Sequence, residues 1–176
     1  RTIGLIGLGK IPQTLVPKAQ AFGLNVMAYD PFVEEDIPTM LNVKMVDFEH
    51  LLAHSDYISI HAPLNPDTQH MFNADAFKQM KAGALLVNTA RGPLVDEAAL
   101  AVALDKGQLA GAALDVLSDE PPSADFVLLN RENVILTPHT AYYSEDALLD
   151  LQTKAAEDVA NVLSGKEPRY PVNKLD

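Results

Sequence analysis

The sequence predicts an α/β domain in which helices flank a parallel, doubly wound sheet. Short runs of aliphatic and β-branched residues alternate with longer stretches that have helical periodicity. Most of the short runs are apolar on both faces, which is typical of strands buried between two layers of helices. The 176 residues suffice for one compact domain with its own core and are too few for two full-sized domains.

The boundaries of the predicted elements follow from capping residues. Asn73 is expected to cap a helix over residues 74–80, and Asp96 a helix over residues 97–106 that Gly107 ends. Ser144 is expected to open a long final helix with one apolar stripe. The strands are expected at residues 2–6, 25–29, 43–46, 57–60, 84–88, 111–115 and 133–136, and residues 117–125 are expected to form a loop.

The composition narrows the classes of function. The chain has no cysteine, which excludes disulfides, thiolate metal sites and a cysteine nucleophile and fits a reducing compartment. Its formal net charge of −11 disfavours a nucleic acid as a direct partner. No apolar run reaches the ~18 residues of a membrane span, and nothing at the start resembles a signal peptide. We therefore expect a cytoplasmic protein that binds a small anionic ligand at a local site.

A glycine-rich turn follows the first predicted strand and opens the first predicted helix. Gly7 suits a tight turn, and Gly9 would let the backbone approach a pyrophosphate. The free amides at the start of the helix, at Lys10 and Ile11, would then face that anion. Pro12 replaces the third glycine of the dinucleotide-binding pattern; it suits the first turn of a helix but adds bulk between helix and strand.

The position of Asp30 strengthens this incomplete pattern. Asp30 ends the second predicted strand, 21 residues after Gly9 (30 − 9), where an acid is expected to meet the ribose hydroxyls of a dinucleotide. A carboxylate there would repel a 2′-phosphate, so NAD is favoured over NADP. The alternative is a plain glycine turn with Asp30 as a strand-end cap. The strand–helix–strand context favours the dinucleotide interpretation and hence a Rossmann fold.

Three further loops, at residues 88–92, 113–122 and 137–141, follow predicted strands and carry ionisable side chains. The carboxyl ends of parallel strands share one edge of a sheet. We therefore expect these side chains to converge near the glycine turn. They are Arg91, Asp115, Glu120 and His139.

These segments occur in the order that is typical of a known family. GLGKI with Asp30, NTARGPLVDE, ALDV followed by DEPP, and TPHTA together resemble the D-isomer-specific 2-hydroxyacid dehydrogenases. HSDYISIHAPLN and PHTAYYSE are most similar to the C-terminal-binding-protein branch and to phosphoglycerate-dehydrogenase-like members. The resemblance covers nearly the whole chain. It implies the NAD-binding domain of a two-domain oxidoreductase.

The resemblance also implies roles for individual residues. Arg91 would bind the substrate carboxylate and polarise its carbonyl group. His139 would protonate the ketone oxygen in reduction or deprotonate the hydroxyl in oxidation, while Glu120 would hydrogen-bond the far side of the imidazole. Asp115 would orient the nicotinamide carboxamide. The other contacts to NAD would come from Gly7, Gly9, Lys10, Ile11, Asp30, Ala62, Pro63, Thr68, Thr89, Ala90 and His139.

Three functions compete at this point. The first is an NAD-dependent dehydrogenase of small 2-hydroxy or 2-oxo acids, and the second is an NAD(H)-sensing regulatory or corepressor-like protein of the same family. The third is another NAD-linked enzyme, such as formate dehydrogenase or adenosylhomocysteine hydrolase, against which Glu120 in its EPP context argues. Arg91, Asp115, Glu120 and His139 are each also compatible with ordinary surface or capping roles. No metal site is expected, because His50 and His54, four residues apart, have no third ligand.

The predicted organisation places an NAD-binding domain in residues 1–143. Residues 144–176 would form a helix and tail that return toward a substrate domain. Because Arg1 already lies in the first strand region, we expect an excised domain whose substrate domain is largely absent. Such a chain is expected to bind NADH weakly and to turn over little by itself, because closure of the two domains completes the site. The whole protein is expected to be a homodimer built on this domain.

Overall fold

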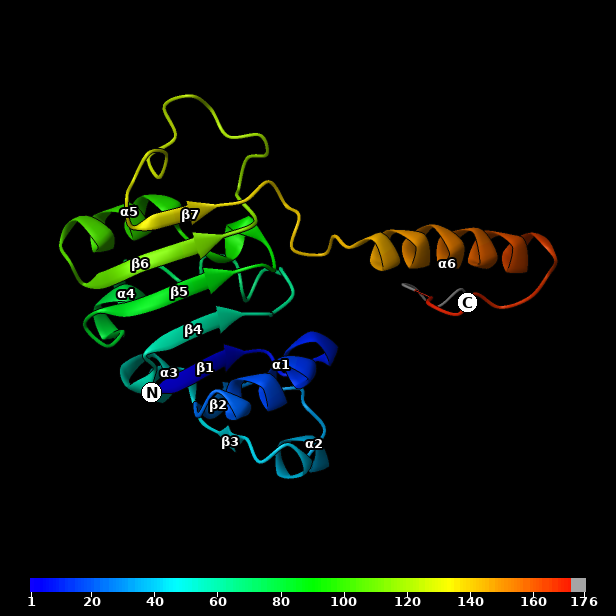
Figure 1. The fold of residues 1–176 in the computed structure, drawn as a ribbon, viewed down its shortest axis with the longest axis horizontal. Coiled ribbons are helices and arrows are strands. Elements are labelled where there is room, and N and C mark those ends of the chain that lie inside the picture. Colours follow the sequence, from blue (N-terminus) through cyan, green and yellow to red (C-terminus); the bar gives the residue numbers. More distant parts are fainter. Residues whose placement is uncertain (172–176) are drawn as a thin grey trace. The chain divides into compact units, whose positions relative to one another are not determined.

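The computed structural model describes residues 1–171, and the chain divides into two compact units, Arg1–His139 and a second that begins at Thr140. The first unit is built around one 7-stranded sheet with all neighbouring strands parallel (Figure 1). Its elements are β1 (Thr2–Ile6), α1 (Lys10–Ala21), β2 (Asn25–Tyr29), α2 (Asp36–Met40), β3 (Lys44–Met45), α3 (Phe48–His54), β4 (Tyr57–Ile60), α4 (Ala74–Gln79), β5 (Ala84–Asn88), the 3-10 helix η1 (Gly92–Leu94), α5 (Glu97–Asp105), β6 (Leu109–Leu114) and β7 (Val134–Leu136). The predicted α/β, doubly wound parallel sheet is confirmed.

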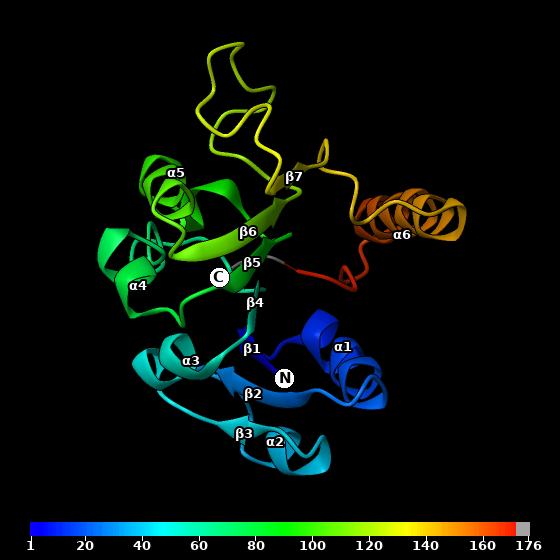
Figure 2. The ribbon, with the colours of Figure 1, turned by 60° about the vertical axis from the view of Figure 1, so that its left-hand side comes forward.

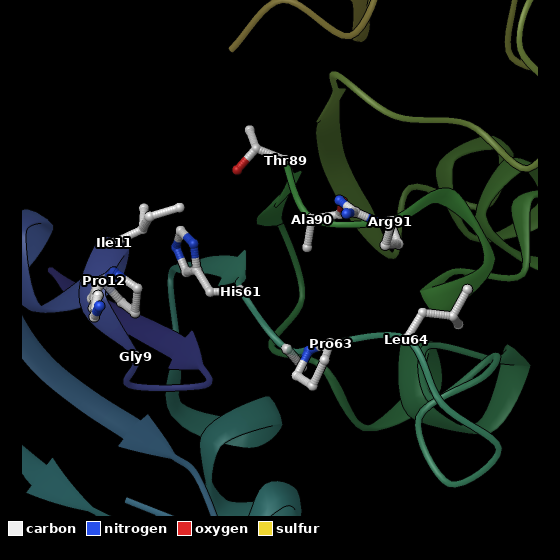
Figure 3. A pocket seen from close by; sticks show the side chains of 11 residues that line it. Gly9, Ile11, Pro12, His61, Pro63, Leu64, Thr89, Ala90 and Arg91 are labelled. Carbon is white, nitrogen blue, oxygen red and sulfur yellow. The ribbon is translucent and has the colours of Figure 1, made fainter. Parts of the chain in front are cut away.

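The strand order β3-β2-β1-β4-β5-β6-β7 reverses direction between β1 and β4. From β1 the chain first builds toward one edge through β2 and β3, and it then returns to build the other half from β4 onward. At such a switch point the loops after the two central strands diverge, which opens a crevice at the carboxyl edge of the sheet. The loops after β1, β4 and β5 surround a cavity at this edge (Figure 3).

The two faces of the sheet are covered to different extents. The helices α3, α4 and α5 lie along one face, and α1 lies on the other (Figure 2). The larger core forms between the sheet and α3–α5, and a smaller core joins α1 to β1 and β2. Within the described part of the first unit, the α1 side of β5–β7 stays open, with Leu85 36% and Ile135 65% exposed. The expected burial on both faces therefore holds only for the half of the sheet that α1 covers.

The predicted caps are confirmed by hydrogen bonds. The Asn73 side chain accepts from Asp75 N (3.0 Å) and Ala76 N, and the Asp96 side chain accepts from Ala99 N (3.0 Å). Helices α4 and α5 each end one residue earlier than expected. Strand β6 starts two residues earlier than expected and runs through Gly111. A Cβ on Gly111 would lie 2.8 Å from Asn133 O, so this glycine permits close packing of strands and does not break the strand.

The second unit contains α6 (Glu145–Leu163), with Ser144 Oγ accepting from Ala147 N (3.0 Å) as predicted. None of the residues of α6, all of which are described, is buried. Its apolar stripe is thus exposed, and Leu151, Val159 and Val162 are all more than half exposed. Among residues 1–171, no helix is long and apolar enough to span a membrane. The expected return of this segment toward a substrate domain stays a prediction, and the end of the predicted tail lies outside the described residues.

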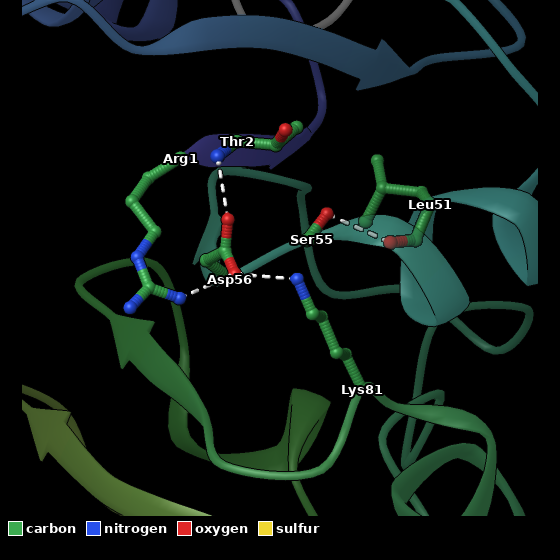
Figure 4. Close-up of polar contacts among 6 residues, drawn as sticks. All are labelled: Arg1, Thr2, Leu51, Ser55, Asp56 and Lys81. Carbon is green, nitrogen blue, oxygen red and sulfur yellow. Dashed lines mark hydrogen bonds and ion pairs between the residues drawn. The ribbon is translucent and has the colours of Figure 1, made fainter.

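Asp56 ties the amino ends of β1 and β4 to the turn before β5 (Figure 4). Its Oδ1 accepts from Lys81 Nζ (2.7 Å) and Arg1 Nη1 (3.1 Å), and its Oδ2 accepts from Thr2 N (2.8 Å). The side chain is only 11% exposed. The hydrogen bond from Lys81, followed by that from Thr2 N, holds the pKa of Asp56 well below its usual range. This carboxylate is therefore expected to stabilise the fold in its charged form.

Replacing Asp56 with Asn is expected to lower the Tm by several degrees at neutral pH, because Lys81 and Arg1 lose their counter-charge and Thr2 N loses its charged acceptor. Since the folded pKa lies below the ordinary value of 3.8, the wild-type advantage is complete above that pH and disappears as the pH falls further. Melting curves followed by circular dichroism test both points. The control is Asp75→Asn, which removes the partner of Lys78 at a site that is 82% exposed and should change little. Equal effects of the two substitutions would contradict the role of Asp56.

Candidate cofactor and active site

A cavity of about 510 Å³ opens at the switch point. This volume falls in the range of small-molecule sites. Three loops line it: the turn after β1, the loop after β4 and the loop after β5 (Figure 3). The lining residues are Gly9, Lys10, Ile11, Pro12, His61, Ala62, Pro63, Leu64, Thr89, Ala90 and Arg91. Most of the residues expected to bind the cofactor are thus brought together here.

Gly7 and Gly9 are glycines for different reasons. Gly7 has φ +89°, a conformation that favours glycine, and a Cβ on it would make a tight contact of 3.1 Å with the His61 backbone. Gly9 has an ordinary φ of −74°, and among the described residues other than its chain neighbours no heavy atom lies within 4 Å of a Cβ position. The protein itself therefore does not require glycine at position 9. The missing side chain leaves open space directly above the start of α1.

The start of α1 is suited to an anion. Helix α1, which is fully described, has no side-chain cap and no acidic residue in its first turn. Its first amides and the positive end of its dipole therefore face the space above Gly9. Pro12 is buried at the third position of the helix, ahead of the first helical bond from Gln13 N to Gly9 O (3.0 Å). Pro12 therefore removes no helical hydrogen bond, and the turn fits the pyrophosphate of NAD.

Asp30 lies at the end of β2 beside this turn. Its Oδ2 accepts from Leu8 N (2.7 Å), and its Oδ1 accepts from Phe32 N (2.9 Å). The carboxylate is thus held in place by backbone donors, as expected if Asp30 caps the end of the strand. Each oxygen retains a further lone pair, so the same group can accept hydrogen bonds from ribose hydroxyls. The two interpretations are compatible.

His61 is a cavity residue that sequence reasoning missed. It follows β4, directly before Ala62 and Pro63, and its Nε2 lies 2.9 Å from Ser59 Oγ. Burial lowers the pKa of His61 to about 4, so the ring is uncharged at neutral pH. The sequence could have indicated His61 as a cavity residue, because it directly precedes the expected cofactor contacts Ala62 and Pro63.

The loop after β5 is organised by Asn88. This side chain is fully buried; its Nδ2 donates to Arg91 O (2.8 Å), and its Oδ1 accepts from Ala90 N (3.0 Å). These two bonds close the loop and present Thr89 and Ala90 to the cavity. The exposed Arg91 guanidinium donates to Ala90 O (2.6 Å). Its charge therefore lies beside the same cavity as the glycine turn.

A second cavity of about 370 Å³ contains the other ionisable residues. His139 Nδ1 lies 2.8 Å from Glu120 Oε2, and the other oxygen, Oε1, accepts from Leu117 N (2.8 Å). The hydrogen bond from His139, followed by that from Leu117 N, lowers the pKa of Glu120. Asp115 is buried and accepts from Thr137 Oγ1 (2.5 Å). A histidine that is held by a carboxylate on one ring nitrogen is suited to move a proton with the other.

The backbone of His139 is itself unusual. It has φ +54°, a left-handed conformation that is uncommon for residues other than glycine. His139 N donates to Asp115 O (2.9 Å), which ties the end of β7 to the end of β6. The conformation thus arises where two strand-end loops meet. Such outliers cluster at functional sites.

The expected convergence is only partly observed. Asp115, Glu120 and His139 share one cavity, whereas Arg91 lines the other together with the glycine turn. Thr68 lines neither of these two cavities. Its hydroxyl donates to Pro63 O (2.7 Å) within its own loop, and its contact with the cofactor stays a prediction.

Residues 1–171 contain no group of three or more side chains that could hold a metal ion. His50 and His54 stack with ring centroids 4.0 Å apart, and His54 Nδ1 lies 2.8 Å from His50 O.

Comparisons with known proteins agree with this geometry. The family model "D-isomer specific 2-hydroxyacid dehydrogenase, NAD binding domain" matches residues 1–141. D-3-phosphoglycerate dehydrogenase of Archaeoglobus fulgidus is 43% identical over 173 residues, which are 98% of this chain and 33% of that protein. The same-named protein of Methanocaldococcus jannaschii is 41% identical over 174 residues, again 98% of this chain and 33% of that protein. The predicted likeness to phosphoglycerate-dehydrogenase-like members is confirmed.

Solved structures show the same similarity. D-lactate dehydrogenase with NAD⁺ from Lactobacillus jensenii superposes with a TM-score of 0.89 at 34% identity, over 99% of this chain and 56% of that chain. A glyoxylate reductase from Paecilomyes thermophila gives a TM-score of 0.90 at 31% identity, over 98% of this chain and 52% of that chain. The chain thus spans about a third of the curated relatives and about half of the solved structures. It belongs to the family of NAD-binding domains of the D-isomer-specific 2-hydroxyacid dehydrogenases.

Proposed function

We propose that this chain is the cofactor-binding part of an NAD-dependent dehydrogenase that transfers hydride between nicotinamide and a small D-2-hydroxy or 2-oxo acid. The main support for the proposal is the His139–Glu120 pair, with Nδ1 and Oε2 2.8 Å apart. It lies at the same strand edge as the 510 Å³ cavity beside the glycine turn, which we call the dinucleotide cavity. The relatives and solved structures reported above are named as dehydrogenases or a reductase, which does not favour the regulatory alternative.

The proposed roles follow from the position of each group. The amides at Lys10 and Ile11 would hold the pyrophosphate, and Asp30 would hold the ribose. Bound NAD would supply or accept the hydride. Arg91 would attract the substrate carboxylate by a charge-assisted contact. His139 would give or take the proton at the substrate oxygen, while Glu120 keeps the ring in one orientation.

The organisation of the whole protein is part of the proposal. Residues 1–143 would form the NAD-binding domain, and residues 144–176 would return toward the substrate domain, for which the exposed apolar stripe of α6 provides a packing surface. We also propose a cytoplasmic homodimer, on the basis of the family resemblance and the cysteine-free composition. Sedimentation of the whole protein tests the dimer.

Replacing Asp30 with Ala is expected to narrow the preference for NADH over NADPH by about tenfold, because a carboxylate no longer repels the 2′-phosphate. Titration of the chain with each dinucleotide, followed by nicotinamide fluorescence, measures the two dissociation constants. Replacement of the exposed Asp36 by Ala is the control and should leave the ratio unchanged. An unchanged ratio in Asp30→Ala, or no binding of NADH by the wild-type chain, would count against the proposed function.

Replacing Gly9 with Val is expected to weaken NADH binding by about a hundredfold, because the side chain would fill the space above the start of α1. The fold should persist, since a Cβ at position 9 meets no described residue beyond its chain neighbours within 4 Å. The same titration measures the loss, and circular dichroism verifies the fold. Ala21→Val, at the exposed far end of α1, is the matched control. Unchanged affinity of Gly9→Val would place the cofactor elsewhere.

A further inference from the structure

A side chain at the start of α5 reaches the loop that carries Glu120. Glu97, the first residue of α5, accepts a hydrogen bond through Oε1 from Ser118 N (2.7 Å), across 21 residues of sequence. Ser118 lies two residues before Glu120. The contact thus joins a rigid helix to an exposed loop.

Gly92 supports the same loop from a second direction. A Cβ on Gly92 would lie 1.9 Å from the Leu117 carbonyl carbon and 2.4 Å from Ser118 N. The Gly92 backbone therefore packs directly against the peptide between Leu117 and Ser118. That peptide is therefore contacted both by Gly92 of η1 and by the Glu97 carboxylate.

The supported peptide leads to the acid/base pair. Leu117 N donates to Glu120 Oε1 (2.8 Å), which leaves Oε2 to face His139 Nδ1 (2.8 Å). Displacement of Leu117 and Ser118 would therefore move one anchor of the Glu120 carboxylate. It would leave the other oxygen without a defined direction toward the imidazole.

The partial burial of Glu97 and the nearby Asp119 both disfavour the charged form of its carboxylate. Partial burial raises the pKa of Glu97, and the hydrogen bond from Ser118 N acts in the opposite direction. The negative charge of the nearby Asp119 opposes ionisation further. Glu49, the second residue of α3, also lies in a first helical turn and is exposed, so a favourable position at a helix start does not by itself require such a contact.

We infer that Glu97 is a positioning residue for the acid/base pair: it holds the Leu117–Ser118 peptide so that Glu120 presents one oxygen to His139. The inference deepens the proposed function and rests on it for its catalytic meaning. The physical claim concerns only the orientation of Glu120 and His139, and it is measurable without turnover. A small shift in such an anchor is sufficient to misplace a catalytic group.

The test compares three variants of the chain by NMR. Glu97→Ala removes the acceptor, Glu97→Gln keeps an oxygen at the same reach, and Glu49→Ala removes an acid from the start of another helix. The first readout is hydrogen exchange at the Leu117 and Ser118 amides. The second is the ¹⁵N shifts of the His139 ring, which report whether the neutral imidazole carries its proton on Nδ1.

Glu97→Ala is expected to accelerate exchange at both amides about tenfold and to replace the Nδ1–H form of His139 by a mixture of tautomers. Glu97→Gln should retain the wild-type pattern, and so should Glu49→Ala. If Glu97→Ala does not fold, Glu97→Asp, which keeps the charge but shortens the reach, should show the same two losses. Wild-type exchange and tautomer in the folded Ala or Asp variant overturn the inference. Failure of the wild-type chain to bind NADH, titrated in parallel, would instead count against the proposed function.

Discussion

Replacing His139 with Asn is expected to lower kcat for the reduction of 2-oxo acids about a thousandfold in the protein that joins this chain to its substrate domain. Asparagine tolerates the left-handed conformation that His139 adopts at φ +54°, so the loop should survive the substitution. What disappears is the ring that would give or take the proton at the substrate oxygen. NADH binding to the chain should stay nearly unchanged.

The measurement is steady-state turnover with NADH against a panel of 2-oxo acids, together with an NADH titration. His70 offers a matched control, because it also has positive φ (51°), is exposed and lines neither the dinucleotide cavity nor that of His139. His70→Asn should retain wild-type kcat. If His139→Asn turned over as fast as the wild type, the acid/base assignment would be wrong.

Replacing Gly92 with Ala is expected to destabilise the first unit by about 3 kcal/mol, at the upper end of the usual cost of overpacking. The new methyl group would overlap the Leu117 carbonyl carbon, 1.9 Å away, and backbone cannot yield as the end of a long side chain can. The peptide between Leu117 and Ser118 would have to move. The hydrogen bonds from Leu117 N to Glu120 and from Ser118 N to Glu97 would then weaken as well.

Urea unfolding of the chain, followed by circular dichroism, measures this loss of stability. Gly9→Ala is the matched control, since it makes the same chemical change at φ −74° with open space around the Cβ. Because Gly9 is the N-cap of α1 and alanine caps less well, this control should cost about 1 kcal/mol at most. If Gly92→Ala lowered the free energy of unfolding no more than Gly9→Ala does, the expected clash with the Leu117 carbonyl carbon would be wrong.

Local chemistry made much of the fold predictable. Asn73, Asp96 and Ser144 each cap the helix expected of them, because a capping side chain bonds to amides only two or three residues away. The strands β1, β2, β4 and β5 have the expected bounds. The common edge of parallel strands predicted that Glu120 and His139 lie near each other, and the family resemblance implied their pairing, which the 2.8 Å contact shows.

The remaining features depend on contacts between segments that are distant in sequence. In the sequence Gly92 does not differ from an ordinary loop glycine, because its close contact with the Leu117 backbone arises only in the folded chain. The contact of Glu97 with Ser118 spans 21 residues, and no local periodicity encodes it. The separation of Arg91 from His139 into different cavities likewise depends on how two loops project beyond their strands, whereas sequence reasoning located only the shared edge.

The uncharged state of His61 determines how the dinucleotide cavity responds to the medium. With its pKa near 4, this ring adds no charge between about pH 5 and 8, so Lys10 and Arg91 are the only cations among the described residues that line the cavity. In the proposed complex Lys10 would lie near the dianionic pyrophosphate of NAD and Arg91 near the substrate carboxylate, within a protein of net charge −11. Dissolved ions screen exposed charges of this kind. Capture of the cofactor should therefore weaken as the ionic strength rises and stay nearly constant across the neutral pH range.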